Sequence, residues 1–271
     1  MSLLSSSFFI VWFLMEVGVL SFIIILLSST TSNSYSCVVK YFLFQAIASI
    51  LLFITFLLEK YTMLLVPVIL IIKIGIAPFH LWFIIIINKI NILNLIWVSV
   101  IQKLVPLRLF IFVRYVELLS HIVVIRLRLA SLNIIVQTKF NKIIGASSVY
   151  SSSWLVVRVI IVERLTWGFI LIYAFAQTNL VIFYNRIKIS PIKSLFRQSY
   201  YIGLLIVSFI LILGGFPPSP LFFMKLILIQ ESVSQNITLL VMSLVVNARI
   251  VIFSYLNLIL IFFSSSLRKN N

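Results

Sequence analysis

Four ionisable side chains lie deep inside long apolar runs of this 271-residue sequence. Glu16 occurs in WFLMEVGVLSFIIIL, and the three lysines deepest in apolar segments are Lys73, Lys103 and Lys225. Burial disfavours the charged form of an amine, whereas a nearby carboxylate favours it. Small movements can therefore switch such a lysine between ammonium and amine, and this chemistry suits proton transfer.

Each of these lysines lies beside a proline that can interrupt a helix. Lys73 precedes Pro78 in KIGIAPFHLW, Lys103 precedes Pro106 in QKLVPL, and Lys225 follows the prolines of GGFPPSPLFFMK. Proline frees the carbonyl four residues earlier, and membrane proteins place water and polar backbone at such mid-membrane breaks. A single lysine can instead extend to the membrane surface. Three such sites, together with a buried glutamate, favour a functional set.

The composition predicts the class of protein in which these four ionisable side chains lie. Apolar residues make up 63% of the chain and charged residues 10%, against about 45–50% and about 25% in soluble domains. Such a chain cannot cover a water-soluble surface, and no polar stretch is long enough to form a second domain. We expect an all-α integral membrane protein, with residues 1–271 forming a single transmembrane domain.

A membrane crossing needs about 20 apolar residues, and this length predicts a polytopic bundle of about nine transmembrane helices, some of them broken. The predicted segments are 5–27, 38–58, 62–87, 91–113, 117–137, 142–161, 165–184, 198–230 and 236–263. Alternate connections differ in basic residues, and the positive-inside rule then places the N-terminus outside and the C-terminus inside. The basic side carries Lys40, Lys89, Lys139, Lys142, Arg186, Lys188, Lys193, Arg197, Arg268 and Lys269, and the other side carries Lys60, Arg114 and Arg164.

Two regions leave alternatives open. Arg126 and Arg128 in segment 117–137 lie about 200° apart on a helix, so they cannot share one protected face, and one of them must snorkel or find a partner. The basic connection Asn185 to Ser199 either lies along the membrane surface or forms a solvated loop. Arg158 and Arg249 also fall within predicted spans.

Several site classes are excluded. The net charge of +16 is spread between apolar runs, which favours anionic lipid, including cardiolipin, over nucleic acid. Cys37 is the single cysteine, and His80 and His121 are the two histidines. They fall at unsuitable positions for a shared haem or metal, so we expect this chain to bind no cofactor. His80 remains a candidate proton relay.

Six segments, in this order, resemble the family of mitochondrial NADH dehydrogenase subunit 2, an antiporter-like membrane subunit of respiratory complex I. They are WFLMEVGVLSFI, KYFLFQAIAS, KIGIAPFHLW, WVSVIQKLVPL, QTKFNKIIGASS and GGFPPSPLFFMKLILIQE. The resemblance covers about Trp12 to Glu231. It departs where Phe83 to Ile85 replace a Pro-Glu pair of the family, and the chain is shorter by about one helix at each end, as in nematode-like forms.

The resemblance implies a role for each matched residue. Glu16 pairs with Lys73, Lys103 is the central lysine, and Lys225 is the outlet-side lysine of a proton path. His80 and Lys142 match further motif positions and are candidate relays. The resemblance also implies an inner mitochondrial membrane location, other membrane-arm and accessory subunits of complex I as partners, and NADH, FMN, iron-sulfur clusters and ubiquinone bound in other subunits.

Two rival functions use the same residues. A stand-alone cation/proton antiporter would need the same buried lysines, and a structural scaffold would use the charges to hold helices together. Purification inside a large NADH-oxidising assembly argues against the first, and loss of pumping in an assembled Lys103→Met variant argues against the second.

Overall fold

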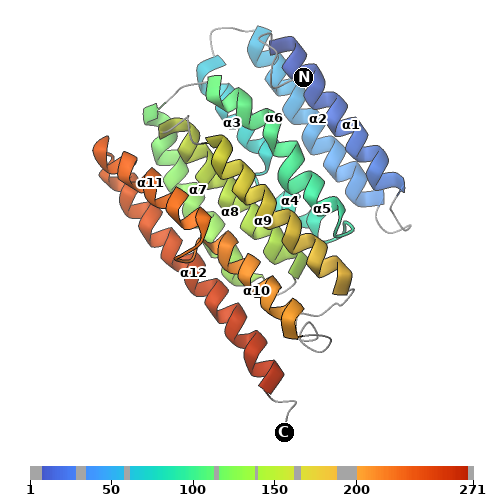
Figure 1. The fold of residues 1–271 in the computed structure, drawn as a ribbon. Coiled ribbons are helices and arrows are strands. Elements are labelled where there is room, and N and C mark those ends of the chain that lie inside the picture. Colours follow the sequence, from blue (N-terminus) through green and yellow to red (C-terminus); the bar gives the residue numbers. More distant parts are fainter. Residues whose placement is uncertain are drawn as a thin grey trace.

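The computed structural model describes residues 8–28, 35–57, 62–112, 116–137, 140–161, 166–187 and 200–267, and their regular elements are all helices. The helices run side by side in one bundle, with α1 and α12 at opposite sides (Figure 1). Their bounds are α1 Phe8–Ser28, α2 Tyr35–Leu57, α3 Thr62–Ile74, α4 Leu81–Ile87, α5 Asn94–Ile96, the π-helix η2 Trp97–Ile101, α6 Gln102–Phe112, α7 Val116–Val136, α8 Phe140–Ile161, α9 Thr166–Ile187, α10 Tyr200–Gly214, α11 Pro220–Ser234 and α12 Thr238–Leu267.

The described helices include four that are long and apolar enough to cross a membrane, namely Phe9–Ser28, Tyr35–Leu57, Thr166–Asn185 and Thr238–Leu260. Leu65–Ile74 and Gly203–Gly214 are shorter apolar helices. The all-α membrane class is therefore supported, whereas the number of nine crossings stays a prediction. Their outward faces are apolar, as expected for a surface in contact with lipid.

Helix α8 lies at the centre of the bundle. It contacts α4, α6, α7, α9, α10 and α11, and every residue from Ile143 to Arg158 is buried. A helix that is buried on all sides must satisfy its polar side chains within the protein. The serine hydroxyls of this stretch do so by donating to carbonyls one turn back in α8, for example Ser147 to Ile144 at 2.7 Å.

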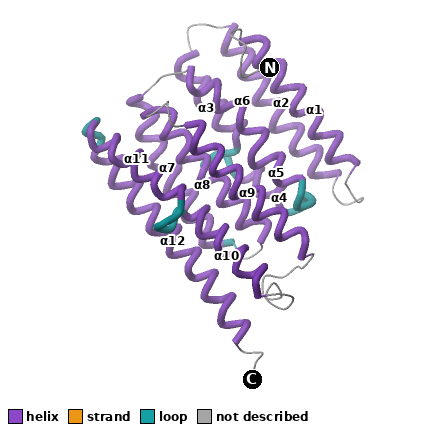
Figure 2. Tube along the Cα trace, in the orientation of Figure 1, coloured by secondary structure: helices purple, strands orange, loops and turns teal. Residues whose placement is uncertain are grey.

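The first predicted break is present between α3 and α4 (Figure 2). Gly75 adopts φ +74°, in the left-handed region that favours glycine. The next amide, that of Ile76, donates to the Ile71 carbonyl at 3.1 Å, which is the bond that ends a helix in a Schellman motif. The chain then passes through the cis bond before Pro78 and starts α4.

The second predicted break, between α10 and α11, has the same local design (Figure 2). Gly215 has φ +75°, and the Phe216 amide donates to the Leu211 carbonyl at 3.1 Å. Helix α11 restarts at Ser219, whose hydroxyl caps the helix by accepting from the Phe222 amide at 3.3 Å. The predicted segments 62–87 and 198–230 are thus each two helices.

The break expected near Lys103 is wrong. Pro106 lies inside the continuous helix α6. The irregularity is upstream, where η2 widens the helix and the Gln102 amide donates to the Trp97 carbonyl. A π-turn keeps the backbone hydrogen-bonded, so this lysine is held on an unbroken helix.

The two arginines of α7 have different environments. Arg126 is buried, whereas Arg128 is exposed, as their opposed positions on the helix predict. Arg126 lies on a helix that packs against α8 and α12. The membrane-surface or loop alternatives for Asn185 to Ser199 fall mainly on residues 188–199, which lie outside the described residues.

Candidate functional site

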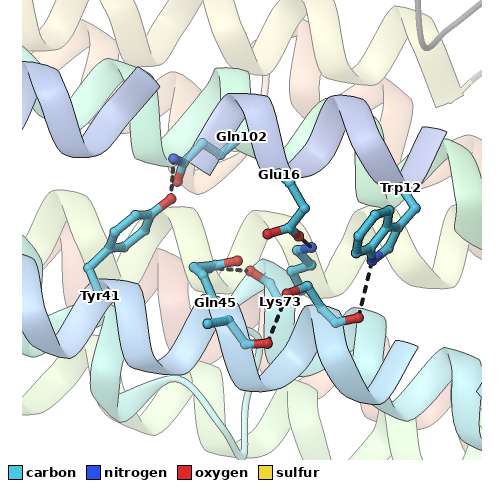
Figure 3. Close-up of polar contacts among 8 residues, drawn as sticks. Trp12, Glu16, Tyr41, Gln45, Lys73 and Gln102 are labelled. Atoms are coloured by element: carbon cyan, nitrogen blue, oxygen red, sulfur yellow. Dashed lines mark hydrogen bonds and ion pairs between the residues drawn. The ribbon is translucent and has the colours of Figure 1, made fainter. Parts of the chain in front are cut away.

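The site begins with an ion pair between α1 and α3. Lys73 Nζ lies 3.0 Å from Glu16 Oε1, and their side chains are 3% and 26% exposed. Lys73 is in the last turn of α3, where the negative end of the helix dipole stabilises a cation. Because α3 ends here, the Lys73 carbonyl lacks a helical partner. Gln45 Nε2 of α2 donates to it at 3.1 Å (Figure 3).

Two further contacts fix α2 against its neighbours around this pair (Figure 3). Trp12 Nε1 of α1 donates to the Ser49 carbonyl at 3.1 Å. Gln102 Nε2 of α6 donates to the hydroxyl of Tyr41. These bonds bring α1, α2, α3 and α6 together, and polar groups from all four helices face the same region.

A cavity of about 100 Å³ lies between these helices. That volume accommodates several water molecules, since one needs about 10–15 Å³. Its walls are mostly apolar, with polar groups from four residues that already make the contacts described above. The lining residues are Leu14, Met15, Gly18, Val19, Tyr41, Gln45, Lys73, Trp97, Ile101, Gln102, Val105 and Pro106. Water could thus extend from Lys73 to the residue that precedes Lys103.

Lys103 points from α6 onto α8. Its Nζ donates to the Ser148 carbonyl at 2.9 Å and to the Ser152 hydroxyl at 2.6 Å. The same nitrogen lies 4.9 Å from the centre of the Phe83 ring. Lys103 is 3% exposed, and the three groups that its amine contacts are neutral. A neutral environment of this kind lets an amine exchange its proton more readily than a carboxylate partner would.

Lys225 points from α11 onto the break after α10. Its Nζ donates to the Gly214 carbonyl at 2.9 Å, one of the carbonyls that the end of α10 leaves without a helical partner. The nitrogen also lies 5.1 Å from the ring centre of Tyr150 and 5.2 Å from that of Trp154. As at Lys73, the end of a helix supplies the negative dipole beside the amine.

Lys103 and Lys225 contact α8 at the same level but on opposite sides. Lys103 binds residues 148 and 152, and Lys225 lies over residues 150 and 154. At about 100° per residue these two contact points are about 160° apart around the helix. The backbone of α8 therefore stands between the two amines.

No contact within the described part of the chain joins the remaining predicted site residues to these lysines. His80 lies at the break before α4, and its buried Nδ1 has no hydrogen-bond partner among the described residues. Lys142 lies in the first turn of α8 and is partly exposed. The side chain of His121 lies outside the described residues. Within the described part of the chain, no group of three potential metal ligands occurs.

Arg158 is a further buried cation beside this group. It is fully buried on α8, and its Nη1 donates to the Met224 carbonyl at 3.2 Å. Met224 directly precedes Lys225 in α11. The guanidinium of Arg158 therefore binds α11 at the residue next to Lys225. Arg249, by contrast, is exposed on α12.

Sequence reasoning did not single out the neutral polar side chains that lie around the lysines. A polar side chain inside an apolar run is costly in a membrane. The position of a polar side chain in such a run could therefore have pointed to Gln45, Tyr41 and Gln102. Ser148 and Ser152 belong to a run of serines that also stands out in an apolar helix. Which lysine each of them contacts depends on how the helices pack.

Two solved structures share this fold. A chain of respiratory complex I from Thermus thermophilus, solved with bound aureothin, superposes with a TM-score of 0.72 at 17% identity, covering 86% of this chain and 60% of that one. A chain of the Mrp complex from Dietzia sp. superposes with a TM-score of 0.74 at 14% identity, covering 84% of this chain and 51% of that one. The fold is therefore that of a multi-helix membrane protein, here with buried lysines beside two broken helices.

Relatives of known name identify the family within this class. The chain is 30% identical to NADH-ubiquinone oxidoreductase chain 2 of Artemia franciscana, over 94% of this chain and 83% of that one. It is 28% identical to the chain of that name from Anopheles gambiae, over 98% and 83%, and 26% identical to that of Myxine glutinosa, over 95% and 80%. No protein-family model matches it. The chain belongs to the NADH-ubiquinone oxidoreductase chain 2 family.

Proposed function

We propose that this chain is a proton-translocating membrane subunit of an NADH:ubiquinone oxidoreductase. The observation that carries the proposal is the set of three buried lysines in one bundle, the first paired with the carboxylate of Glu16 and the other two held by neutral groups. A charged side chain at mid-membrane costs about 2.5–3.5 kcal/mol on insertion scales. A purely structural helix pair would not need three of them.

In this proposal the ion pair controls the first amine. A neighbouring subunit alters the attraction between Glu16 and Lys73, and Lys73 releases its proton when the carboxylate moves away. The cavity beside Lys73 supplies room for the water that carries the proton toward Lys103. Lys225 then receives the proton and releases it. His80 and Lys142 are proposed relays at the ends of this path.

The rest of the proposal combines the sequence patterns with membership of the family. Residues 1–271 form one domain with about nine crossings in the inner mitochondrial membrane, with the N-terminus toward the intermembrane space and the C-terminus toward the matrix. Other membrane-arm and accessory subunits of the complex are its partners, and cardiolipin and other phospholipids contact its outer face. NADH, FMN, iron-sulfur clusters and ubiquinone bind to other subunits, so this chain takes no part in electron transfer.

Replacement of Lys103 tests the proposal. Lys103→Met removes the amine but keeps an unbranched apolar side chain, so we expect the complex to assemble and NADH-driven proton uptake by sealed membrane vesicles to be lost. Lys40→Met, at an exposed lysine of α2, is the matched control and should leave proton uptake unchanged. Wild-type proton uptake in an assembled Lys103→Met complex would refute the proposal.

The two rival functions predict other outcomes. A free cation/proton antiporter would be purified apart from any NADH-oxidising assembly and would exchange cations by itself in vesicles. A scaffold would either lose assembly in Lys103→Met or keep full proton uptake. The likeness to the Mrp complex concerns the fold alone, and no contact in the described structure favours either rival.

A further inference from the structure

The proposed transfer from Lys103 to Lys225 has to pass around α8. The two amines meet this helix at one level and about 160° apart, and the hydrogen-bonded backbone between them offers no titratable group. A proton can therefore travel around either side of the helix. The side chains on those two sides differ sharply.

Three serines form an arc around one side of α8. Ser148, whose carbonyl binds Lys103, is followed around the helix by Ser151 and then by Ser147. Residues three and four apart are neighbours on a helix surface, with Cβ atoms about 5–6 Å apart. Each hydroxyl donates to a carbonyl of α8: Ser148 to Gly145, Ser151 to Ser147, and Ser147 to Ile144. Their oxygen lone pairs remain available to accept a proton.

The opposite side of α8 is mainly apolar. At the same level it presents Ala146, Val149 and Val156, all buried. Ser153 is the hydroxyl on that side at this level, and it donates to the Val149 carbonyl at 3.0 Å. Three neighbouring hydroxyls thus lie on the side of Ser147, against one on the other side.

Tyr255 of α12 lies between the end of this arc and Lys225. Tyr255 and Ser147 line one small cavity of about 10 Å³, which is close to the space that a single water needs. The Tyr255 ring packs on Gly214, where an added Cβ would lie 2.6 Å from the ring. The carbonyl of that same glycine accepts the hydrogen bond from Lys225.

The Tyr255 hydroxyl lies close to the Ser147 hydroxyl without a well-formed hydrogen bond. Tyr255 is 2% exposed, and its hydroxyl is near enough to Ser147 to interact with it, but it meets the geometry of a hydrogen bond with no described residue. A buried hydroxyl that is poorly hydrogen-bonded costs about 1–3 kcal/mol, so packing alone gives no reason for a tyrosine here instead of phenylalanine.

We propose that the Tyr255 hydroxyl, with one water shared with Ser147, relays protons between the serine arc of α8 and Lys225. The inference rests on the proposed function, because it names the path of one of its steps. The Lys103 ammonium gives one proton to the Ser152 hydroxyl that it contacts and becomes an amine, and Ser152 passes one proton to the arc at Ser148, one turn back. Each hydroxyl and the water accept one proton and release another, and the Lys225 amine takes the last one. No group is oxidised or reduced, and every hydroxyl ends unchanged.

The test compares hydroxyl deletions on the two sides of α8 in the assembled complex. Tyr255→Phe keeps the ring that packs on Gly214, and Ser147→Ala removes only the oxygen. We expect each to slow NADH-driven proton uptake by sealed vesicles about tenfold, below the roughly 10²-fold or more of a positioned proton donor because water can replace part of the path. The solvent deuterium isotope effect should rise in both, which a loss of packing would not cause.

The matched controls are Ser153→Ala, a buried serine on the apolar side of α8, and Tyr184→Phe, a buried tyrosine of α9. Both should keep wild-type uptake and isotope effect. Unchanged uptake in Tyr255→Phe and Ser147→Ala, with loss in Lys103→Met, overturns the relay and leaves the proposed function standing. Unchanged uptake in Lys103→Met overturns the proposed function itself.

Two other results are also decisive. A defect in Ser153→Ala that exceeds the defect in Ser147→Ala overturns the arc, because the proton then passes on the other side of α8. If Tyr255→Phe prevents assembly, Ser147→Ala decides alone. The Ser147 hydroxyl donates within α8, to the Ile144 carbonyl, and alanine leaves the helix backbone intact, so its removal should not disturb the helix packing.

Discussion

Replacing Gly215 by alanine should displace Lys225 from the end of α10. Gly215 has φ +75°, and a Cβ built there lies 2.7 Å from Lys225 Nζ and 3.2 Å from its Cδ and Cε. Lys225 cannot keep its bond to the Gly214 carbonyl with a methyl group at that distance. The Lys225 amine must therefore rotate away from the Gly214 carbonyl, even though the substitution adds only one carbon atom.

The structure sets the size of this effect. Left-handed backbone costs a non-glycine residue roughly 1–2 kcal/mol, and a hydrogen bond from a charged donor contributes about 1.5–3 kcal/mol. Gly215→Ala should therefore disfavour the wild-type position of Lys225 by about 2.5–5 kcal/mol. At about 1.36 kcal/mol per factor of ten, this predicts a drop of tenfold or more in proton uptake per assembled complex.

The assay is NADH-driven proton uptake by sealed vesicles, normalised to the assembled complex on native gels. Gly75→Ala is the control for backbone strain. Its φ is nearly the same, at +74°, but its Cβ meets the rings of Trp82 and Phe83 instead of an amine. Wild-type uptake in Gly215→Ala would show that the observed position of Lys225 is not required, and the reasoning would fail.

Two other substitutions probe single contacts. Glu16→Gln keeps an oxygen that can accept from Lys73 but removes the charge, so we expect the complex to assemble with little proton uptake. Glu16→Asp keeps the charge and should retain part of the proton uptake. Equal proton uptake in the two variants would contradict the role of the ion pair. Ser131 Oγ donates to Asn247 Oδ1 at 2.9 Å between α7 and α12. A double-mutant cycle with alanine at both positions, measured by thermal inactivation of the solubilised complex, should give a coupling of about 0.6 kcal/mol and at most about 1.7. A coupling near zero would mean that this bond does not stabilise the helix pair.

The helices could be predicted from the sequence because length and apolarity determine them locally. The predicted segments 117–137 and 142–161 correspond to α7 and α8. The breaks near Gly75 and Gly215 were also predictable, since glycine and proline act through the backbone of their own segment. Pro106 was misjudged for the same reason. A proline inside a helix breaks it only if the surrounding packing does not hold the helix together, and that is a property of the neighbours.

The partners of the lysines could not be predicted in this way. The depth of Lys103 and Lys225 in apolar runs is visible in the sequence, but the choice of Ser148 and Ser152 as contacts of one, and of the Gly214 carbonyl as the contact of the other, depends on which helix faces lie together. The pairing of Glu16 with Lys73 was expected from the family resemblance and is present in the structure. Spacing alone did not require it.

By itself, the sequence determined that the protein is an all-helical membrane protein, that its helices are interrupted near Gly75 and Gly215, and that Lys73, Lys103 and Lys225 are buried. These properties follow from hydrophobicity and backbone chemistry along a short stretch of chain. Only the tertiary structure decided that Lys103 and Lys225 lie on opposite sides of α8, and that Tyr255 of α12 stands beside the end of the serine arc. Such positions come from the packing of helices far apart in the chain, because one helix leaves its rotation and depth relative to the others undefined.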